Sequence, residues 1–135
     1  MADKQLVHAR TAVYNVNYHF VWCVKYRRKV LVGEIENRLK QIFHEIAKVK
    51  GFEIKSMEIM PDHVHIFAIA HPKIAPGYMY KMLKGISGRR LFIEFPEIKS
   101  KLWKGRLWNP VTYTQTVGHV SGETILRYIE DQKSK

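Results

Sequence analysis

The sequence predicts an α+β fold built on one sheet. Segments in which apolar residues recur at every second position alternate with segments in which they recur at every third or fourth position. These strand-like and helix-like segments occur in the order β-α-β-β-α-β, and an additional C-terminal helix is expected at about residues 121–133. This is the order of the ferredoxin-like arrangement, in which two helices cover one face of the sheet. With 135 residues and no evident linker, the chain is expected to form a single domain, 1–135.

The first strand is expected to span residues 11–25, where every even-numbered position from 14 to 24 is apolar or aromatic. Because side chains alternate between the two faces of a strand, these positions are expected to face the core. Asn15 and Asn17 lie on the other face and are expected to be solvated. His19 shares that face, and the pattern does not decide its role.

Two further strands are expected at residues 52–60 and 63–70, joined as a hairpin by Pro61 and Asp62. The second of them is apolar after its first three residues, which is typical of a buried strand. A last strand is expected at residues 111–117, where β-branched residues and a tyrosine are concentrated.

The clearest helix is expected at residues 33–50, and Gly51 follows it as a C-terminal stop. Its expected core stripe is Ile35, Leu39, Ile42, Ile46 and Val49. A second helix is expected to begin near Pro76, with the stripe Met79, Met82, Leu83 and Ile86. Arg90 would fall into this second stripe on a straight helix, so either the helix bends there or Arg90 contacts a phosphate.

The charge of the chain indicates a polyanionic partner. Lys and Arg number 23 against 12 Asp and Glu, giving a net charge of +11. Nucleic acid is the first candidate. A membrane surface is the second, but the sequence contains no basic amphipathic helix of the required kind and no apolar stretch of spanning length. Cys23 is the only cysteine, and no signal peptide is visible, so a reduced, cytoplasmic setting is expected.

Basic residues occur beside aromatic ones in two segments, residues 25–29 and residues 99–108. This combination suits phosphate contact and base stacking. The DNA-binding candidates from these segments and from the second helix are Lys25, Tyr26, Arg27, Arg28, Lys81, Lys84, Arg89, Arg90, Lys104 and Arg106. The alternative is that the first segment is an ordinary charged connection and that the tryptophans of the second segment, Trp103 and Trp108, are core residues. We expect one of the two tryptophans to be in the core.

His63 and His65 stand two apart at the start of a buried strand, so both point to one face. Their backbones are about 7 Å apart, close enough for both rings to bind one metal ion. They alternate with the residues assigned to the core and are therefore expected to face the open side of the sheet. The alternative is that each is a histidine at the edge of the core, bonded to backbone or carboxylate.

Tyr128 and Gln132 lie four apart on one face of the terminal helix. Considered alone, Tyr128 would be interpreted as a packing residue and Gln132 as a solvent-exposed residue. Together with the histidines they offer a different chemistry, since nicking DNA requires a nucleophile and a metal that polarises the scissile phosphate. Two imidazoles and one amide oxygen form a mixed set without thiolate, compatible with Mg²⁺ or Mn²⁺ rather than structural zinc.

Four motifs are informative when their order and spacing are considered together. The chain contains, in order, Tyr18-His19-Phe20-Val21-Trp22, Lys25-Tyr26-Arg27-Arg28, Met60-Pro61-Asp62-His63-Val64-His65 and Tyr128-Ile129-Glu130-Asp131-Gln132. In this order and spacing they resemble the single-tyrosine HUH transposases, the small transposases of insertion sequences of the IS200 type.

The resemblance implies a role for each of four residues. His63 and His65 match the histidine pair that holds the metal, Gln132 matches the polar residue that completes the metal site, and Tyr128 matches the nucleophile. It also implies a homodimer with possible composite active sites. Such a dimer would bind single-stranded DNA hairpins at element ends, and would cleave and rejoin strands through a 5′-phosphotyrosine without a nucleotide cofactor.

Three alternatives stay open at this point. A domesticated relative that cuts repeated palindromes would have the same active site. A non-catalytic nucleic-acid-binding module of ferredoxin-like fold would have merely structural histidines. A replication-initiation nickase would share the chemistry, usually in a longer chain.

Overall fold

The computed structural model of the protein describes residues 7–8, 13–14, 16–102 and 105–117. Several predictions fall outside these residues: the terminal helix with Tyr128 and Gln132, and also Asn15, Trp103 and Lys104. The prediction that the whole chain forms one domain stays a prediction. No helix in the described part is both long and apolar enough to cross a membrane.

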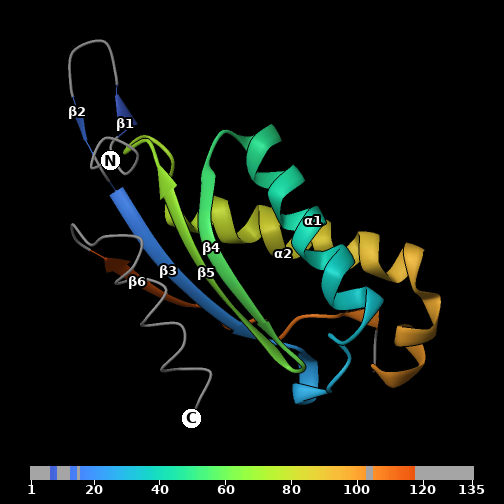
Figure 1. Ribbon diagram of the computed structural model, residues 1–135. Helices are drawn as coiled ribbons and strands as arrows, with labels where there is room; N and C mark the ends of the chain where they lie inside the picture. Colours follow the sequence, from blue (N-terminus) through green and yellow to red (C-terminus); the bar gives the residue numbers. More distant parts are fainter. Residues whose placement is uncertain (1–6, 9–12, 15, 103–104, 118–135) are drawn as a thin grey trace.

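Four antiparallel strands form the main sheet, in the order β4-β5-β3-β6. These strands are β3 (Val16–Cys23), β4 (Glu53–Met60), β5 (His63–Ala70) and β6 (Tyr113–Val117). Both long helices, α1 (Glu34–Lys50) and α2 (Pro76–Glu94), lie on the same side of this sheet (Figure 1). The predicted ferredoxin-like order is confirmed, including the hairpin of β4 and β5.

The predicted strand at residues 11–25 is divided between two sheets. A short strand β1 (Val7–His8) pairs with β2 (Val13–Tyr14) in a separate two-stranded sheet, and the main sheet begins only at β3. Two short 3-10 helices were also not predicted, η2 (Lys25–Arg27) and η3 (Pro96–Lys101). Period-two alternation continues across residues 13–24, so the sequence pattern alone does not reveal the change of sheet.

The face of the main sheet away from the helices is buried at its centre. Asn17, His19 and His65 on this face are 3%, 1% and 6% exposed, and Phe67 is also buried. The expectations of an open face and of a solvated Asn17 are therefore wrong. Alternation assigns a residue to a face, but it does not indicate whether that face is covered.

Helix α1 confirms the predicted helix and its stop. Gly51 adopts the left-handed conformation with φ +86°, and its N–H donates to the carbonyl of Ala47. The buried stripe includes Phe43 and Ala47, which were not predicted, whereas Val49 is 78% exposed. Val49 was assigned wrongly because it lies roughly 90° around the helix from the centre of the stripe.

Helix α2 continues without interruption through Arg90 to Glu94. Arg90 is satisfied by ion pairs, since its Nη1 lies 2.9 Å from Glu45 Oε1 of α1 and its Nε lies 3.8 Å from Glu94 Oε2. Neither a bend nor a phosphate is needed to explain its position. Arg90 instead helps to join α2 to α1.

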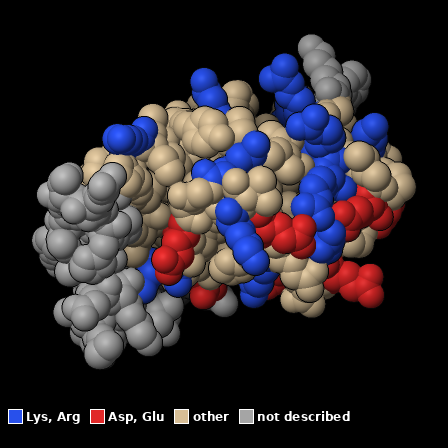
Figure 2. Space-filling view, turned by 90° about the horizontal axis from the view of Figure 1, so that it is seen from above, with Lys and Arg blue, Asp and Glu red and all other residues tan. Residues whose placement is uncertain are grey.

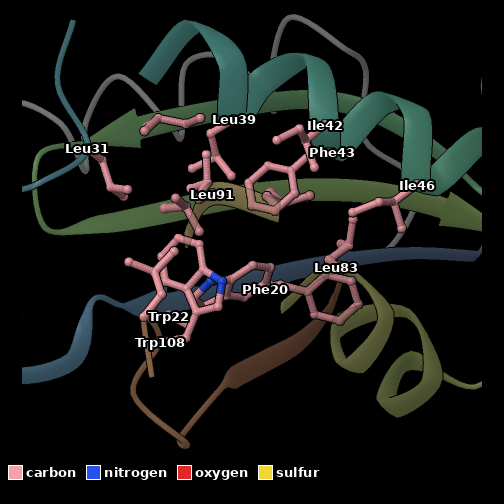
Figure 3. Close-up of a cluster of buried hydrophobic side chains, with 14 of the residues drawn as sticks. Phe20, Trp22, Leu31, Leu39, Ile42, Phe43, Ile46, Leu83, Leu91 and Trp108 are labelled. Carbon is pink, nitrogen blue, oxygen red and sulfur yellow. The ribbon is translucent and has the colours of Figure 1, made fainter. Parts of the chain in front are cut away.

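The core lies between the helices and the sheet and is rich in aromatic rings (Figure 3). Trp22 of β3 stands nearly perpendicular to Phe43 and to Trp108, with centroid distances of 5.9 and 5.8 Å. Trp108 Nε1 donates a hydrogen bond to Ser87 Oγ at 3.0 Å. One tryptophan of the basic segment is thus confirmed as a core residue.

Candidate metal and nucleic-acid site

His63 and His65 begin β5 and share the sheet face opposite the core, as predicted. The residue between them, Val64, is fully buried in the core cluster. The two imidazole centroids are 5.1 Å apart, with their planes at 73°. In the neighbouring strand β3, Cys23 pairs with His63 and Val21 pairs with His65. The strand pairing therefore holds both rings at one end of the sheet.

The first histidine is oriented by a carboxylate. His63 Nδ1 lies 2.7 Å from Asp62 Oδ1, and Arg27 Nε donates to Asp62 Oδ2 at 3.0 Å. Burial raises the pKa of Asp62, but the hydrogen bond with His63 and the charge of Arg27 outweigh it, so the net pKa is lowered. Asp62 is thus ionised at neutral pH and accepts a hydrogen bond from His63 Nδ1–H. The lone pair of His63 Nε2 is then available to a metal.

The second histidine is oriented by another histidine. His65 Nδ1 lies 3.2 Å from His19 Nε2, and the His19 ring stacks on Phe67 at 4.4 Å. Burial, and secondly the charge of His65, lowers the pKa of His19 to about 4. Burial also lowers the pKa of His65, with His63 adding to the effect and Glu58 opposing it. Both rings are therefore neutral at pH 7. In the tautomer in which His65 Nδ1–H donates to His19 Nε2, the Nε2 lone pair of His65 is available to a metal.

His19 was the residue whose role the sequence left undecided. The sequence contained part of the signal, because His19 alternates with the core-facing residues of its strand and so lies on the same face as Asn17. The information that β3 and β5 are neighbours was missing from the pattern. The structure brings His19 to the histidine pair as a hydrogen-bond partner.

The donor set fits a divalent metal. Each Nδ1 atom of His63 and His65 has a hydrogen-bond partner, so the two Nε2 atoms are the ring nitrogens that would bind a metal. A carboxylate partner such as Asp62 is usual for a metal-binding histidine. Among the described residues, no third His, Cys, Asp or Glu joins them to form a metal-binding group. The predicted third ligand, Gln132, lies outside the described residues, so the complete set stays a prediction.

His19 gives a stability prediction. Its pKa is lowered in the folded state, so between pH 6.5 and 4 the unfolded chain binds more protons, and stability falls as the pH falls. From pH 7 to pH 5 this single group should cost about 2 kcal/mol. Urea unfolding at both pH values should show a smaller loss in His19→Gln, which can replace the Nε2 contact but does not titrate. Equal losses in the two proteins would contradict the assignment.

The basic loop adjoins the histidine site. Asp62 carbonyl oxygen accepts the N–H of Val24 at 2.8 Å, and Arg27 is bound to the Asp62 side chain. Tyr26 and Arg27 both have left-handed backbones, with φ of 59° and 51°, which is uncommon for residues other than glycine. Tyr26 and Arg28 are exposed. Lys25, whose Nζ lies 5.3 Å from the Tyr26 ring, completes this loop.

The cations of α2 differ in their surroundings. Lys81 and Arg89 are exposed. Lys84 is half-buried, donates to the Asn109 carbonyl at 2.7 Å and to Thr112 Oγ1 at 2.9 Å, and has its pKa lowered by burial. Lys84 therefore links α2 to the segment before β6. Arg106 is exposed and lines a cavity together with Arg89.

Comparison with known proteins gives the class and then the family. The chain is 46% identical over 131 residues to the ISDra2 transposase TnpA of Deinococcus radiodurans, covering 97% of this chain and 94% of that protein. It is 31% identical to the transposase for insertion sequence element IS200 of Salmonella typhimurium, covering 96% and 83%. The chain thus falls in the transposase class. The family described as "Transposase IS200 like" matches residues 12–132, and the chain belongs to this family.

Solved structures agree with the fold. A crystal structure described as a transposase from Deinococcus radiodurans superposes with a TM-score of 0.78 at 41% identity, covering 93% of this chain and 97% of that one. A REP-associated tyrosine transposase bound to a REP hairpin superposes with a TM-score of 0.62 at 14% identity, covering 95% and 73%. The second likeness concerns the fold alone.

Proposed function

We propose that this transposase cleaves and rejoins single-stranded DNA through Tyr128, with a metal held by His63, His65 and Gln132. The observation that supports it most directly is the paired orientation of the two histidines. Asp62 and His19 each contact an Nδ1 atom, so the two Nε2 atoms at one end of the sheet are the ones proposed to bind the metal. Family membership supplies the reaction class.

The proposed cleavage is a transesterification. The phenolic oxygen of Tyr128 attacks the scissile phosphorus, the bond to the 3′ oxygen breaks, and a 3′-hydroxyl leaves while the 5′-phosphate stays on the tyrosine. A second 3′-hydroxyl then attacks the phosphotyrosine and restores the tyrosine. Bond energy is retained throughout, so no nucleotide cofactor is required. Bound Mg²⁺ or Mn²⁺ would polarise the phosphate that is attacked.

The proposed DNA partner is a hairpin with single-stranded flanks. The loop of Lys25, Tyr26 and Arg28 adjoins the histidine site and offers cations and an exposed ring for phosphates and bases. Figure 2 shows many Lys and Arg side chains toward the right of the view, with Asp and Glu among them. Hairpin binding by a relative of the same fold supports this partner. We extend the proposal to a homodimer, in which the tyrosine of one subunit can serve either histidine site.

The test is an adduct assay. Purified protein would be incubated with a labelled single-stranded hairpin from the DNA flanking its own reading frame, with Mg²⁺ or Mn²⁺, and separated on a denaturing gel. A protein–DNA band that survives denaturation is expected. Tight hairpin binding without an adduct in either metal would favour the non-catalytic module.

Salt dependence gives a separate prediction for the basic loop. Each phosphate contact lowers log K by about 0.7 per tenfold increase in salt for single strands. The double variant Lys25→Gln and Arg28→Gln should therefore lose about 1.4 from this slope in filter-binding titrations. Lys48→Gln, which removes an exposed cation of α1, should leave the slope unchanged. An unaltered slope in the double variant would exclude the loop from the DNA path.

A further inference from the structure

A basic cavity of about 670 Å³ lies between the second half of α2 and residues 105–108. Three exposed cations line it, Arg89, Lys99 and Arg106, and no Asp or Glu lines it among the described residues. Within the described part of the chain, Arg89 and Arg106 form no ion pair, whereas the adjacent Arg90 is bound to Glu45. The cavity is therefore lined by positive charges that ion pairs in the described part of the chain do not neutralise. Such a lining suits an anionic ligand.

Apart from the half-buried Lys84 and three glycines, the remaining lining is apolar. Phe92 and Trp108 contribute to it from the core, and Ile93 is 72% exposed on the same stretch of α2. Lys99 Nζ stands 5.7 Å from the centroid of the Phe92 ring. A planar apolar group with a phosphate attached matches these surroundings, because the plane can lie on the apolar wall while the phosphate meets the cations. A nucleotide has this combination. In a duplex the base is stacked within the helix, so the nucleotide must be unpaired.

Gly85 adds a second, independent observation. It is exposed in the interior of α2, and a Cβ added there would meet no atom within 4 Å. Packing therefore does not require glycine, which destabilises a helix interior relative to alanine. Gly88 differs, since its Cβ would contact Trp108 Cδ1 at 3.5 Å. Because Gly85 lines the cavity, its missing side chain leaves room for a ligand to approach the backbone closely.

We propose that this cavity binds one unpaired nucleotide of the single-stranded DNA beside the hairpin. The base lies against Phe92 and Ile93, and the phosphate contacts Arg89 and Arg106. The proposal rests on the proposed function, because it assigns a separate binding position on the same DNA substrate. It predicts that a side chain at Gly85 would stabilise α2 but weaken the binding of this nucleotide.

The first test separates stability from binding. Gly85→Ala is expected to raise the Tm by a few degrees while weakening binding of a hairpin with a single-stranded flank. Gly85→Leu should weaken that binding by about 10-fold or more and should leave the affinity for a blunt hairpin within about twofold. Gly77→Ala, on the same helix outside the cavity, is the matched control and should leave both affinities unchanged. Equal affinities for the flanked hairpin in all variants would overturn the proposal.

A second measurement covers the case in which Gly85→Leu fails to fold. Arg106→Gln should weaken binding of the flanked hairpin and reduce its salt slope by about 0.7, whereas Lys48→Gln should not. In parallel, 5-iodouracil placed at each unpaired position should give a photo-crosslink to the peptide containing Phe92 from one position. Crosslinks elsewhere, with the Tyr128 adduct still forming, would overturn the nucleotide site and leave the proposed function standing. Absence of both the adduct and hairpin binding in the native protein would instead overturn the proposed function.

Discussion

Replacing Tyr128 with phenylalanine is expected to abolish the covalent protein–DNA adduct while leaving hairpin affinity within about twofold. Phenylalanine keeps the aromatic ring but lacks the oxygen that would attack phosphorus. Removal of a nucleophile typically costs several powers of ten in rate, so adduct formation should fall by roughly 10³-fold or more. Affinity should persist because the cations proposed to contact DNA, such as Arg28, are elsewhere in the chain.

The measurement is a denaturing gel with both proteins at equal hairpin occupancy, established by native gel shift. Tyr113→Phe is the matched control, because Tyr113 is an exposed tyrosine of β6 whose hydroxyl lies 3.2 Å from Gln115 Oε1. It should form the adduct as the native protein does. An adduct that persists in Tyr128→Phe, or vanishes in Tyr113→Phe, would refute the assignment of the nucleophile.

Local patterns predicted most of the fold because each strand and helix carries its own period. The hairpin turn at Pro61 and Asp62, the stop at Gly51 and the β-α-β-β-α-β order all depend on residues close together in the chain. The failures concern long-range packing. Asn17 was expected in solvent, but its face of the sheet is buried, and the period of a strand does not indicate what lies against it.

The candidate site was predicted in a similarly partial way. The spacing of His63 and His65 gave their common face, and the structure confirms it. The same pattern could not reveal that His19, 46 residues away, would bond to His65. Nor could it distinguish Lys84, which is tied to Asn109 and Thr112, from the exposed Lys81, because both read as solvated cations on one helix.

Removal of either histidine should abolish cleavage in a way that added metal does not restore. His63→Ala and His65→Ala each delete one of the two proposed Nε2 ligands, whose rings contact Asp62 and His19. Loss of a partner that only orients a metal ligand typically costs about 10- to 100-fold in metal affinity, so loss of the ligand itself should cost more than roughly 100-fold. Mn²⁺ titrations followed by electron paramagnetic resonance would measure this directly, independently of DNA cleavage.

Asp62→Asn provides the graded comparison. An amide at this position can still contact the His63 ring but loses the charge that favours a proton on Nδ1, so Mn²⁺ affinity should fall by about 10- to 100-fold, and excess Mn²⁺ should restore cleavage. His44→Ala, on the exposed side of α1, should bind Mn²⁺ and cleave as the native protein does. The order of effects separates ligands from the residues that orient them. Full restoration of His65→Ala by Mn²⁺ would place the metal on other residues, and the histidine pair would then be a structural element of the buried sheet face.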